Sequence, residues 1–324
     1  MRAVVVDRPG GPEVLTGAER PDPVAGPGQL VVRLIAAGVN FKDVYEREGR
    51  TSAATPFVPG SEGAGTVLAV GPGVSGFGVG DRVAWWAAPG SYAEQVLVPA
   101  DAAVLLPDDV SGEDAAALML QGLTAHYLTT STYPAAPGET ALVHSAAGGL
   151  GQHLTRLLSG RGVRVLATVS TPEKAEVARA LGADEVVIRG TGVDLAATVR
   201  ELTKGRGVDV VYDGVGRDTF EAGLASLRPR GTFVLVGSAS GPVPAFDPQS
   251  LAARGSLFLT RPTLVHHATD PVELRQRAAE LFDWLRSGTI RVAVGGRYPL
   301  AEAERAHADL QSGRSVGKLL LLPN

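Results

Sequence analysis

Apolar and polar residues follow two different patterns along this chain of 324 residues. In the first third, short β-type apolar runs alternate with turns rich in glycine and proline. From Glu139 onward, short apolar runs alternate with segments in which apolar residues recur at helical spacing. The first pattern predicts a small β-rich domain. The second predicts an α/β domain with a parallel sheet that helices cover on both faces.

The expected elements can be placed by residue number. In the first region we expect strands over residues 29–36, 65–70, 81–85 and 94–99. In the second region we expect strands over 163–169, 185–188, 208–213 and 232–237, with helices over 172–181, 195–203 and 220–227. Past Ser256 we expect a strand over 257–260, a long helix over 271–287 and a last strand over 318–322. The sequence therefore predicts a first domain over 1–120, a second over 121–257, and a segment over 258–324 that returns to the first.

A glycine cluster lies between a predicted strand and a predicted helix. Residues 143–151 read Val-His-Ser-Ala-Ala-Gly-Gly-Leu-Gly, and Ala146, Gly148 and Gly151 occupy the positions of a G-x-G-x-x-G motif, the first as alanine. Bare backbone at a helix N-terminus offers N–H groups and the positive end of the helix dipole to an anion. The strand–helix–strand setting favours a dinucleotide site, although such glycines also serve tight turns without a ligand.

The end of the next strand indicates which dinucleotide is bound. An NAD site carries an acidic residue about twenty residues past the glycines, to hold the ribose hydroxyls. This window instead offers Ser170 and Lys174, and Arg189 follows the third strand. These residues favour a 2′-phosphate and hence NADPH. The alternative is structural: Ser170 and Glu173 would form a capping box, and Lys174 would be a solvated helix residue.

Small residues follow two further strands of the second domain. Gly214 comes after the fourth strand, and Gly237 and Ser238 come after the fifth. Ligands of open α/β sheets bind beyond the carboxyl ends of the strands, so these positions leave room for a flat ring. Taken singly, each is an ordinary strand-to-helix turn.

Composition excludes several functions. The net charge is −4, and the chain has no cysteine. A basic field for nucleic acid is therefore absent, and disulfides and thiolate chemistry are excluded. The chain begins with a strand-like run rather than a secretory leader, and no apolar run reaches membrane-spanning length. We expect a cytoplasmic protein without a membrane or nucleic-acid partner.

Several motifs in a fixed order resemble a known family. They are Gly38-Val-Asn-Phe-Lys-Asp-Val-Tyr45, Pro59-Gly-Ser-Glu-Gly-Ala-Gly65, Val79-Gly-Asp-Arg-Val83, Gln121-Gly-Leu-Thr-Ala125, His144–Gly151 and Tyr212-Asp-Gly-Val-Gly-Arg-Asp218. Over essentially its whole length the chain resembles zeta-crystallin-type NADPH:quinone oxidoreductases of the medium-chain dehydrogenase/reductase superfamily. The resemblance implies a β-rich GroES-like catalytic domain at 1–120 and a Rossmann NADPH-binding domain with a doubly wound parallel sheet at 121–257.

The resemblance also implies roles for individual residues. The substrate would be bordered by Asn40, Asp43, Tyr45 and Tyr127. The cofactor would be bound by Asn40, Gln121, Thr124, Ala147, Gly148, Gly149, Leu150, Gly151, Ser170, Lys174, Arg189, Gly214, Gly237, Ser238 and Lys318. Close relatives have tyrosine more often than arginine at position 189. A homodimer is expected, with the two Rossmann sheets joined along the edge at residues 255–261.

The chain departs from the zinc alcohol dehydrogenases of the same superfamily. Those enzymes carry a cysteine about where Asn40 stands and a histidine at Ser61, besides a four-cysteine structural zinc lobe. A catalytic zinc needs three protein ligands, and the six histidines show no motif spacing for such a site. We therefore predict that no metal is bound.

Chemistry without a metal suits electron-poor acceptors. Hydride addition to a quinone gives an aromatic hydroquinone anion, which water or one weak acid protonates. We predict direct hydride transfer in a dry, oriented site, with Tyr45 or Tyr127 hydrogen-bonded to the acceptor oxygen. One alternative is an NADPH-dependent enoyl-thioester or alkenal reductase, although Gly49 is followed by Arg50 and Thr51 where those enzymes have a Gly-x-Tyr setting. A non-catalytic crystallin-like or RNA-binding role is the other alternative.

Overall fold

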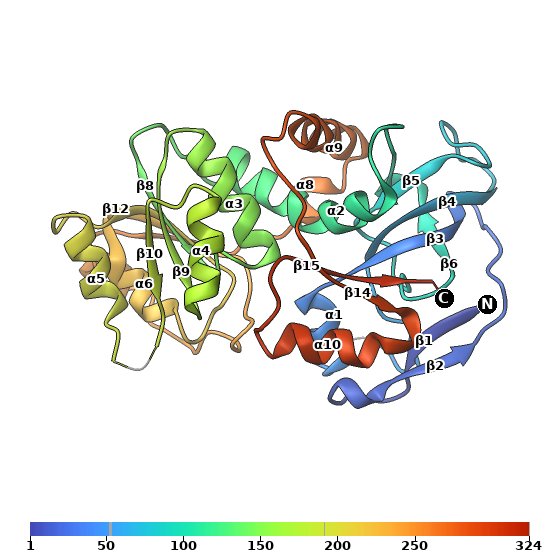
Figure 1. Cartoon of the computed structure of the whole chain (residues 1–324), viewed down its shortest axis with the longest axis horizontal. Helices are drawn as coiled ribbons and strands as arrows, with labels where there is room; N and C mark the ends of the chain where they lie inside the picture. The colour runs from blue at the N-terminus through green and yellow to red at the C-terminus, as the bar shows by residue number, and fades with distance from the viewer. Residues whose placement is uncertain (52–53, 191, 324) are drawn as a thin grey trace. The chain divides into compact units, whose positions relative to one another are not determined.

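The computed structural model describes residues 1–51, 54–190 and 192–323. Within this described part, the chain forms two compact units. Unit 1 comprises Met1–Leu123, His267–Leu285 and Val292–Asn324, and unit 2 comprises Thr124–His266 and Arg286–Arg291. Figure 1 shows both units with their elements labelled.

Unit 1 is built on a seven-stranded sheet in the described residues, in the order β14-β15-β3-β4-β5-β7, with β6 paired to β3. The strands are β3 (Gln29–Val39), β4 (Glu62–Val70), β5 (Arg82–Trp85), β6 (Gln95–Pro99), β7 (Ala103–Leu105), β14 (Val294–Pro299) and β15 (Lys318–Leu322). A separate hairpin pairs β1 (Arg2–Val6) with β2 (Leu15–Glu19). The helices are α1 (Phe41–Arg47), α10 (Ala303–Gln311), the part of α2 (Gly112–Tyr127) up to Leu123, and α9 (Pro271–Arg286) up to Leu285. Short 3₁₀ turns lie at Pro12–Val14, Ala100–Ala102 and Leu300–Glu302.

The C-terminal strand is integrated into the sheet of unit 1. β15 pairs antiparallel with β3, with Leu320 opposite Gly38 and Leu321 opposite Ala37. This pairing extends β3 to Val39, three residues beyond the predicted end at residue 36. Apolar side chains from both strands, among them Leu30 and Leu321, enter one core with Trp85 and Tyr92.

Unit 2 holds a six-stranded sheet in the described residues, in the order β10-β9-β8-β11-β12-β13. The strands are β8 (Thr140–His144), β9 (Arg164–Val169), β10 (Glu185–Ile188), β11 (Val208–Asp213), β12 (Leu227–Leu235) and β13 (Phe258–Thr260), and all neighbours are parallel. The helices are α3 (Gly149–Gly160), α4 (Pro172–Ala180), α5 (Leu195–Leu202), α6 (Phe220–Ser226) and α7 (Ser250–Ala253), and a π-helical turn follows α2 at Leu128–Thr132. The short helix α8 (Val265–Ala268) begins in unit 2 and ends in unit 1. The order is that of the Rossmann fold, so the predicted fold class is confirmed.

Helices cover both faces of this sheet. α3 and α4 lie on one face, and α5 and α6 lie on the other (Figure 1). All five residues of β8 are buried, as expected for a central parallel strand. Leu154, Leu157 and Leu158 of α3 are buried, as their helical spacing in the sequence predicts, whereas Leu150 is only half-buried. The parallel strands bring their carboxyl ends to one edge of the sheet.

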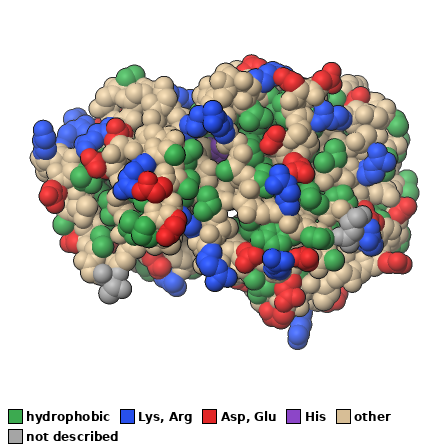
Figure 2. Space-filling view, in the orientation of Figure 1, with side chains coloured by type: hydrophobic (Ala, Val, Ile, Leu, Met, Phe, Trp, Pro, Cys, Tyr) green, Lys and Arg blue, Asp and Glu red, His purple; other side chains and the backbone are tan. Residues whose placement is uncertain are grey.

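The surface carries no dominant charge on the face that Figure 2 shows. Basic and acidic side chains are interspersed there, with hydrophobic side chains between them. This mixing agrees with a net charge of only −4. None of the helices in the described part of the chain has the length and apolarity that a membrane crossing requires.

Candidate functional site

The glycine cluster of unit 2 forms the turn from β8 into α3. Ser145 adopts a left-handed conformation with φ of 56°, and its carbonyl accepts a 2.9 Å hydrogen bond from the Gly148 N–H. Gly148 is the N-cap of α3 and provides no side-chain cap, so the N–H groups of the first helical turn have no side-chain partner at that position. This is the arrangement that binds phosphate at a helix N-terminus.

Gly151 is required for a different reason. A Cβ at this position would lie 2.2 Å from the Ser145 carbonyl oxygen and 2.7 Å from the Ala146 Cα, both backbone atoms. The helix therefore packs directly on the turn only because residue 151 has no side chain. Ala147 and Gln152 tie the same turn together, since Gln152 Nε2 donates to the Ala147 carbonyl at 2.8 Å.

Two cations lie beyond the carboxyl ends of β9 and β10. Burial lowers the pKa of Lys174, and the nearby charge of Arg189 lowers it further. Burial also lowers the pKa of Arg189, although Asp213 and Asp218 partly offset this effect. The Nε atom of Arg189 is buried without a hydrogen-bond partner. Two neighbouring cations, one with an orphaned donor, suit a dianionic group such as a phosphate.

The alternative interpretation of this segment as a capping box is wrong in its register. Thr171, not Ser170, is the N-cap of α4, and its hydroxyl accepts a 3.3 Å hydrogen bond from the Lys174 N–H. Pro172 occupies the first helical position, where its missing N–H costs nothing. Ser170 is therefore released from capping and is exposed.

The ends of β11 and β12 come together at the same edge of the sheet. A Cβ on Gly237 would lie 2.7 Å from the Gly214 carbonyl oxygen, whereas a Cβ on Gly214 would meet no atom within 4 Å. Asp213 is buried and fixes the first of these turns by accepting from the N–H groups of Val215 and Gly216. Thus Gly214 faces open space, and Gly237 is needed for the close approach of the two turns.

Asn40 is the centre of a buried polar cluster in unit 1. Its Oδ1 accepts a 2.7 Å hydrogen bond from Lys318 Nζ, and its Nδ2 donates a 2.6 Å hydrogen bond to Glu62 Oε1. Lys318 also forms an ion pair with Glu62, and both side chains are at most 2 % exposed. The second carboxylate oxygen of Glu62 accepts from the Leu120 N–H at 2.7 Å, which links the cluster to α2.

The other predicted residues occupy varied environments. Asp43 and Tyr127 are buried, and burial raises the pKa of the Tyr127 hydroxyl to about 12. Tyr45 is half-buried, with the Arg50 guanidinium 4.1 Å from its ring centroid. Gln121 is half-buried, and its Oε1 has no hydrogen-bond partner. Thr124 and Ala147 are buried, and Gly149, Leu150 and Ser238 are half-buried.

Sequence reasoning missed the role of Glu62. Glu62 stood only as part of a motif, although a carboxylate among small residues at the start of a strand is a recognisable signal. Tyr92 and His307 were missed as well. The Tyr92 hydroxyl donates to Asp43 Oδ2 at 3.0 Å and lies 3.1 Å from His307 Nε2, and nothing local in the sequence marks these contacts. His144 at the end of β8 is buried, with Nδ1 2.9 Å from Thr168 Oγ1.

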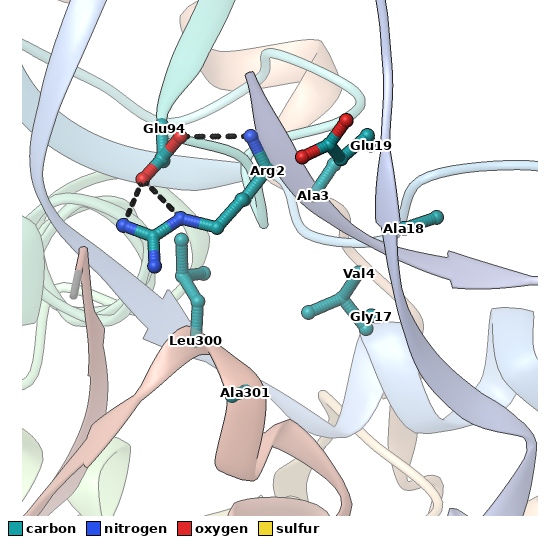
Figure 3. Close-up of a pocket in the computed structure, with 9 residues that line it drawn as sticks. All are labelled: Arg2, Ala3, Val4, Gly17, Ala18, Glu19, Glu94, Leu300 and Ala301. Carbon is teal, nitrogen blue, oxygen red and sulfur yellow. Dashed lines mark hydrogen bonds and ion pairs between the residues drawn. The ribbon is translucent and has the colours of Figure 1, made fainter.

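A separate pocket of about 250 Å³ opens in unit 1. Its lining is formed by Arg2, Ala3, Val4, Gly17, Ala18, Glu19, Glu94, Leu300 and Ala301 (Figure 3). Arg2 and Glu94 face each other at its rim and form an ion pair. The pocket lies on the β1–β2 hairpin and shares no residue with the predicted site.

Comparison with known proteins matches both halves of the chain. The alcohol dehydrogenase GroES-like domain model matches residues 26–108, and the zinc-binding dehydrogenase model matches residues 181–321. In the described residues, no group of three or more His, Cys, Asp or Glu side chains is placed to hold a metal ion.

Curated relatives match the chain over nearly all of its length. A quinone oxidoreductase of Pseudomonas aeruginosa is 45% identical over 318 residues, which is 97% of both chains. A 2-haloacrylate reductase of a Burkholderia species is 41% identical and covers 99% of this chain and 98% of its own.

Two solved structures are similar over the full length of both chains. A mycobacterial protein in complex with NADPH is 52% identical, with a TM-score of 0.97 and coverage of 100% on each side. The Escherichia coli quinone oxidoreductase in complex with NADPH has the same TM-score of 0.97 at 39% identity, again with coverage of 100% on each side.

Proposed function

This chain belongs to the quinone oxidoreductase family of the medium-chain dehydrogenase/reductase superfamily, and we propose that it reduces quinones with NADPH by direct hydride transfer, without zinc. The observation that carries the choice of cofactor is the pair of neighbouring cations Lys174 and Arg189, in which the buried Arg189 Nε has no partner. When bound, NADPH supplies the hydride.

The residues of unit 2 fit the parts of NADPH. The turn at Gly148 and the backbone N–H groups from Gly149 to Gly151 would hold the pyrophosphate, because the helix N-terminus there has no side-chain cap. Lys174 and Arg189 would hold the 2′-phosphate, with Ser170 exposed beside them. Gly214 leaves open space at the same sheet edge, where Gly237 allows the two turns to approach and Ser238 is half-buried.

In unit 1 the chain provides orientation and a tyrosine hydroxyl for the quinone oxygen. We propose that Asn40, Gln121 and Lys318 contact the cofactor. The Oε1 atom of Gln121 supports this proposal, because it is buried and accepts no hydrogen bond. The half-buried Tyr45 is favoured over the buried Tyr127 as the hydroxyl that hydrogen-bonds a quinone oxygen. Both the oxygen and the nitrogen of the Asn40 side-chain amide are hydrogen-bonded, so the orientation of this side chain is fixed before the reaction begins.

The proposal is tested by steady-state oxidation of NADPH with two classes of acceptor. We expect turnover with naphthoquinones to exceed turnover with a crotonyl thioester, and prior treatment with a chelator to leave the rate unchanged. Preferred reduction of the thioester would instead support an enoyl reductase. Binding of NADPH without turnover of either acceptor would support a non-catalytic role.

We also propose a homodimer and a cytoplasmic location. β13 pairs with β12 at one end of the parallel sheet, and Phe258 on it is 61% exposed, which supports pairing through this edge. Size-exclusion chromatography with light scattering should report a dimer for the wild type and a monomer for Phe258→Glu. Cell fractionation tests the location.

A further inference from the structure

Four buried side chains in unit 1 form a chain of hydrogen bonds that ends beside Asn40. Arg47 Nη1 lies 3.2 Å from His307 Nδ1, and His307 Nε2 lies 3.1 Å from the Tyr92 hydroxyl. The Tyr92 hydroxyl donates to Asp43 Oδ2 at 3.0 Å, and the same oxygen accepts from the Asn40 N–H at 2.9 Å. All four side chains are 0 % exposed.

The chemistry of Arg47 sets the direction of every hydrogen bond in this series. A guanidinium has donors and no acceptor, so His307 Nδ1 must accept from Arg47. Nε2 then carries the proton of a neutral imidazole and donates to the Tyr92 oxygen. The single hydroxyl hydrogen of Tyr92 is left for Asp43. Burial, with the nearby Arg47 charge, lowers the pKa of His307 to about 3, in agreement with a neutral ring.

Asp43, the last residue in this series of hydrogen bonds, holds the turn that carries Asn40. Asp43 is the third residue of α1, and its carboxylate accepts from the Asn40 backbone before that helix begins. The side chain of Asn40 is hydrogen-bonded to Lys318 and Glu62. A shift of the Asp43 carboxylate would therefore move the Asn40 backbone and misalign its amide with Lys318.

We propose that Tyr92 and His307 are positioning residues of the reaction, which fix Asn40 through the Asp43 carboxylate. The inference rests on the proposed function, because Asn40 matters only if it orients a reacting group. It also assigns Asp43 to positioning rather than to the border of the substrate, since Asp43 is fully buried and bonded to Tyr92 and Asn40. Well-packed apolar side chains would stabilise the fold as well as these four buried polar side chains do. Stability alone therefore does not explain why the hydrogen bonds all run in one direction toward Asp43.

The test is Tyr92→Phe, which removes one oxygen from a buried ring. We expect kcat to fall by about tenfold while the KM for NADPH stays unchanged, because orientation is lost and binding is not. Tyr298→Phe is the matched control: it also removes a tyrosine–carboxylate hydrogen bond in unit 1, of 2.8 Å to Asp309, and should leave kcat unchanged. Equal kcat in the wild type and both variants would overturn the proposal.

The pH profile separates positioning from mere stabilisation. Burial raises the pKa of Asp43 to about 6, opposed by Lys42 and by the Tyr92 hydrogen bond and reinforced by Glu46. Protonation of Asp43 replaces its charged acceptor with a weaker neutral one, so kcat should fall on the acid side. Without the Tyr92 donor the pKa of Asp43 rises further, and the acid limb of kcat should move to higher pH in Tyr92→Phe only. An unmoved limb contradicts the proposal.

A second pair of variants and a spectroscopic readout do not depend on Tyr92→Phe or on turnover. His307→Gln keeps a donor for Tyr92 and His307→Leu removes it, so the leucine variant should have the lower kcat. In NMR spectra, the side-chain amide signals of Asn40 should shift in Tyr92→Phe and stay in place in Tyr298→Phe. If the wild type reduces no quinone, the proposed function fails, and unshifted Asn40 signals would separately overturn the positioning role.

Discussion

Lys318 Nζ donates a 2.7 Å hydrogen bond to Asn40 Oδ1 and so joins two residues that are 278 positions apart in the sequence. Glu62 contacts both residues. It forms an ion pair with Lys318, and it accepts a hydrogen bond from Asn40 Nδ2. The three side chains are buried, so each depends on the other two for part of its polar contacts.

Glu62→Gln should be strongly destabilising, because the Lys318 ammonium would remain buried without an anion. We expect the free energy of unfolding to fall by about 3–5 kcal/mol in denaturant titrations. Arg305→Gln, which breaks an exposed ion pair of 2.9 Å with Glu302, should cost at most about 1 kcal/mol. The double variant Glu62→Gln/Lys318→Met should recover most of the loss. A loss in Glu62→Gln no larger than that of the control would contradict this account.

Lys174→Glu should discriminate between the two nicotinamide cofactors. A carboxylate in place of the ammonium repels a 2′-phosphate, so the Kd for NADPH should rise by about 10–100-fold, whereas the Kd for NADH should stay near its wild-type value. Fluorescence titration measures both. Lys204→Glu is the control, because it reverses the charge of an exposed lysine in the same unit. Equal weakening of the two cofactors would refute the assignment of a 2′-phosphate site.

Gly151→Ala should destabilise unit 2 and weaken NADPH binding. The new Cβ would meet the Ser145 carbonyl at 2.2 Å, and a backbone atom moves only with the turn itself. We expect a loss of about 1–3 kcal/mol in the free energy of unfolding. Gly160→Ala at the end of the same helix meets no atom within 4 Å and should be neutral or stabilising by up to about 1 kcal/mol. Similar melting temperatures for the two variants would disprove the steric argument.

His144 should make the protein less stable in mild acid. Burial lowers the pKa of His144 to about 4 from its ordinary value of 6.5, so between these values the unfolded chain binds a proton that the folded chain does not. Stability should therefore fall as the pH drops from about 6.5 to 4, by up to about 3 kcal/mol from this residue. His144→Asn, which retains a partner for Thr168, should flatten this slope in unfolding titrations, and exposed His266→Asn should not. An unchanged slope in His144→Asn would show that another group dominates.

Local pattern was sufficient for most of the secondary structure. The predicted strands at 185–188, 208–213 and 318–322 have the observed bounds, because each is a short apolar run between polar turns. β12 begins five residues before its predicted start at residue 232 and ends two residues before its predicted end at 237. There the parallel pairing with β11, which contains a bulge, decides the bounds. The cap at Thr171 rather than Ser170 was missed for a similar reason, since both hydroxyls read alike in sequence.

The sequence by itself determined the family and the alternation that builds the Rossmann sheet, and it singled out the loop and cations that we propose bind NADPH. Each of these features lies within a contiguous segment, where spacing and residue type carry the information. Only the tertiary structure decided what holds Asn40, because Glu62, Tyr92, His307 and Lys318 come from distant parts of the chain. Their meeting depends on the pairing of β15 with β3 and the packing of α10, which arise from the burial of apolar surface over the whole unit.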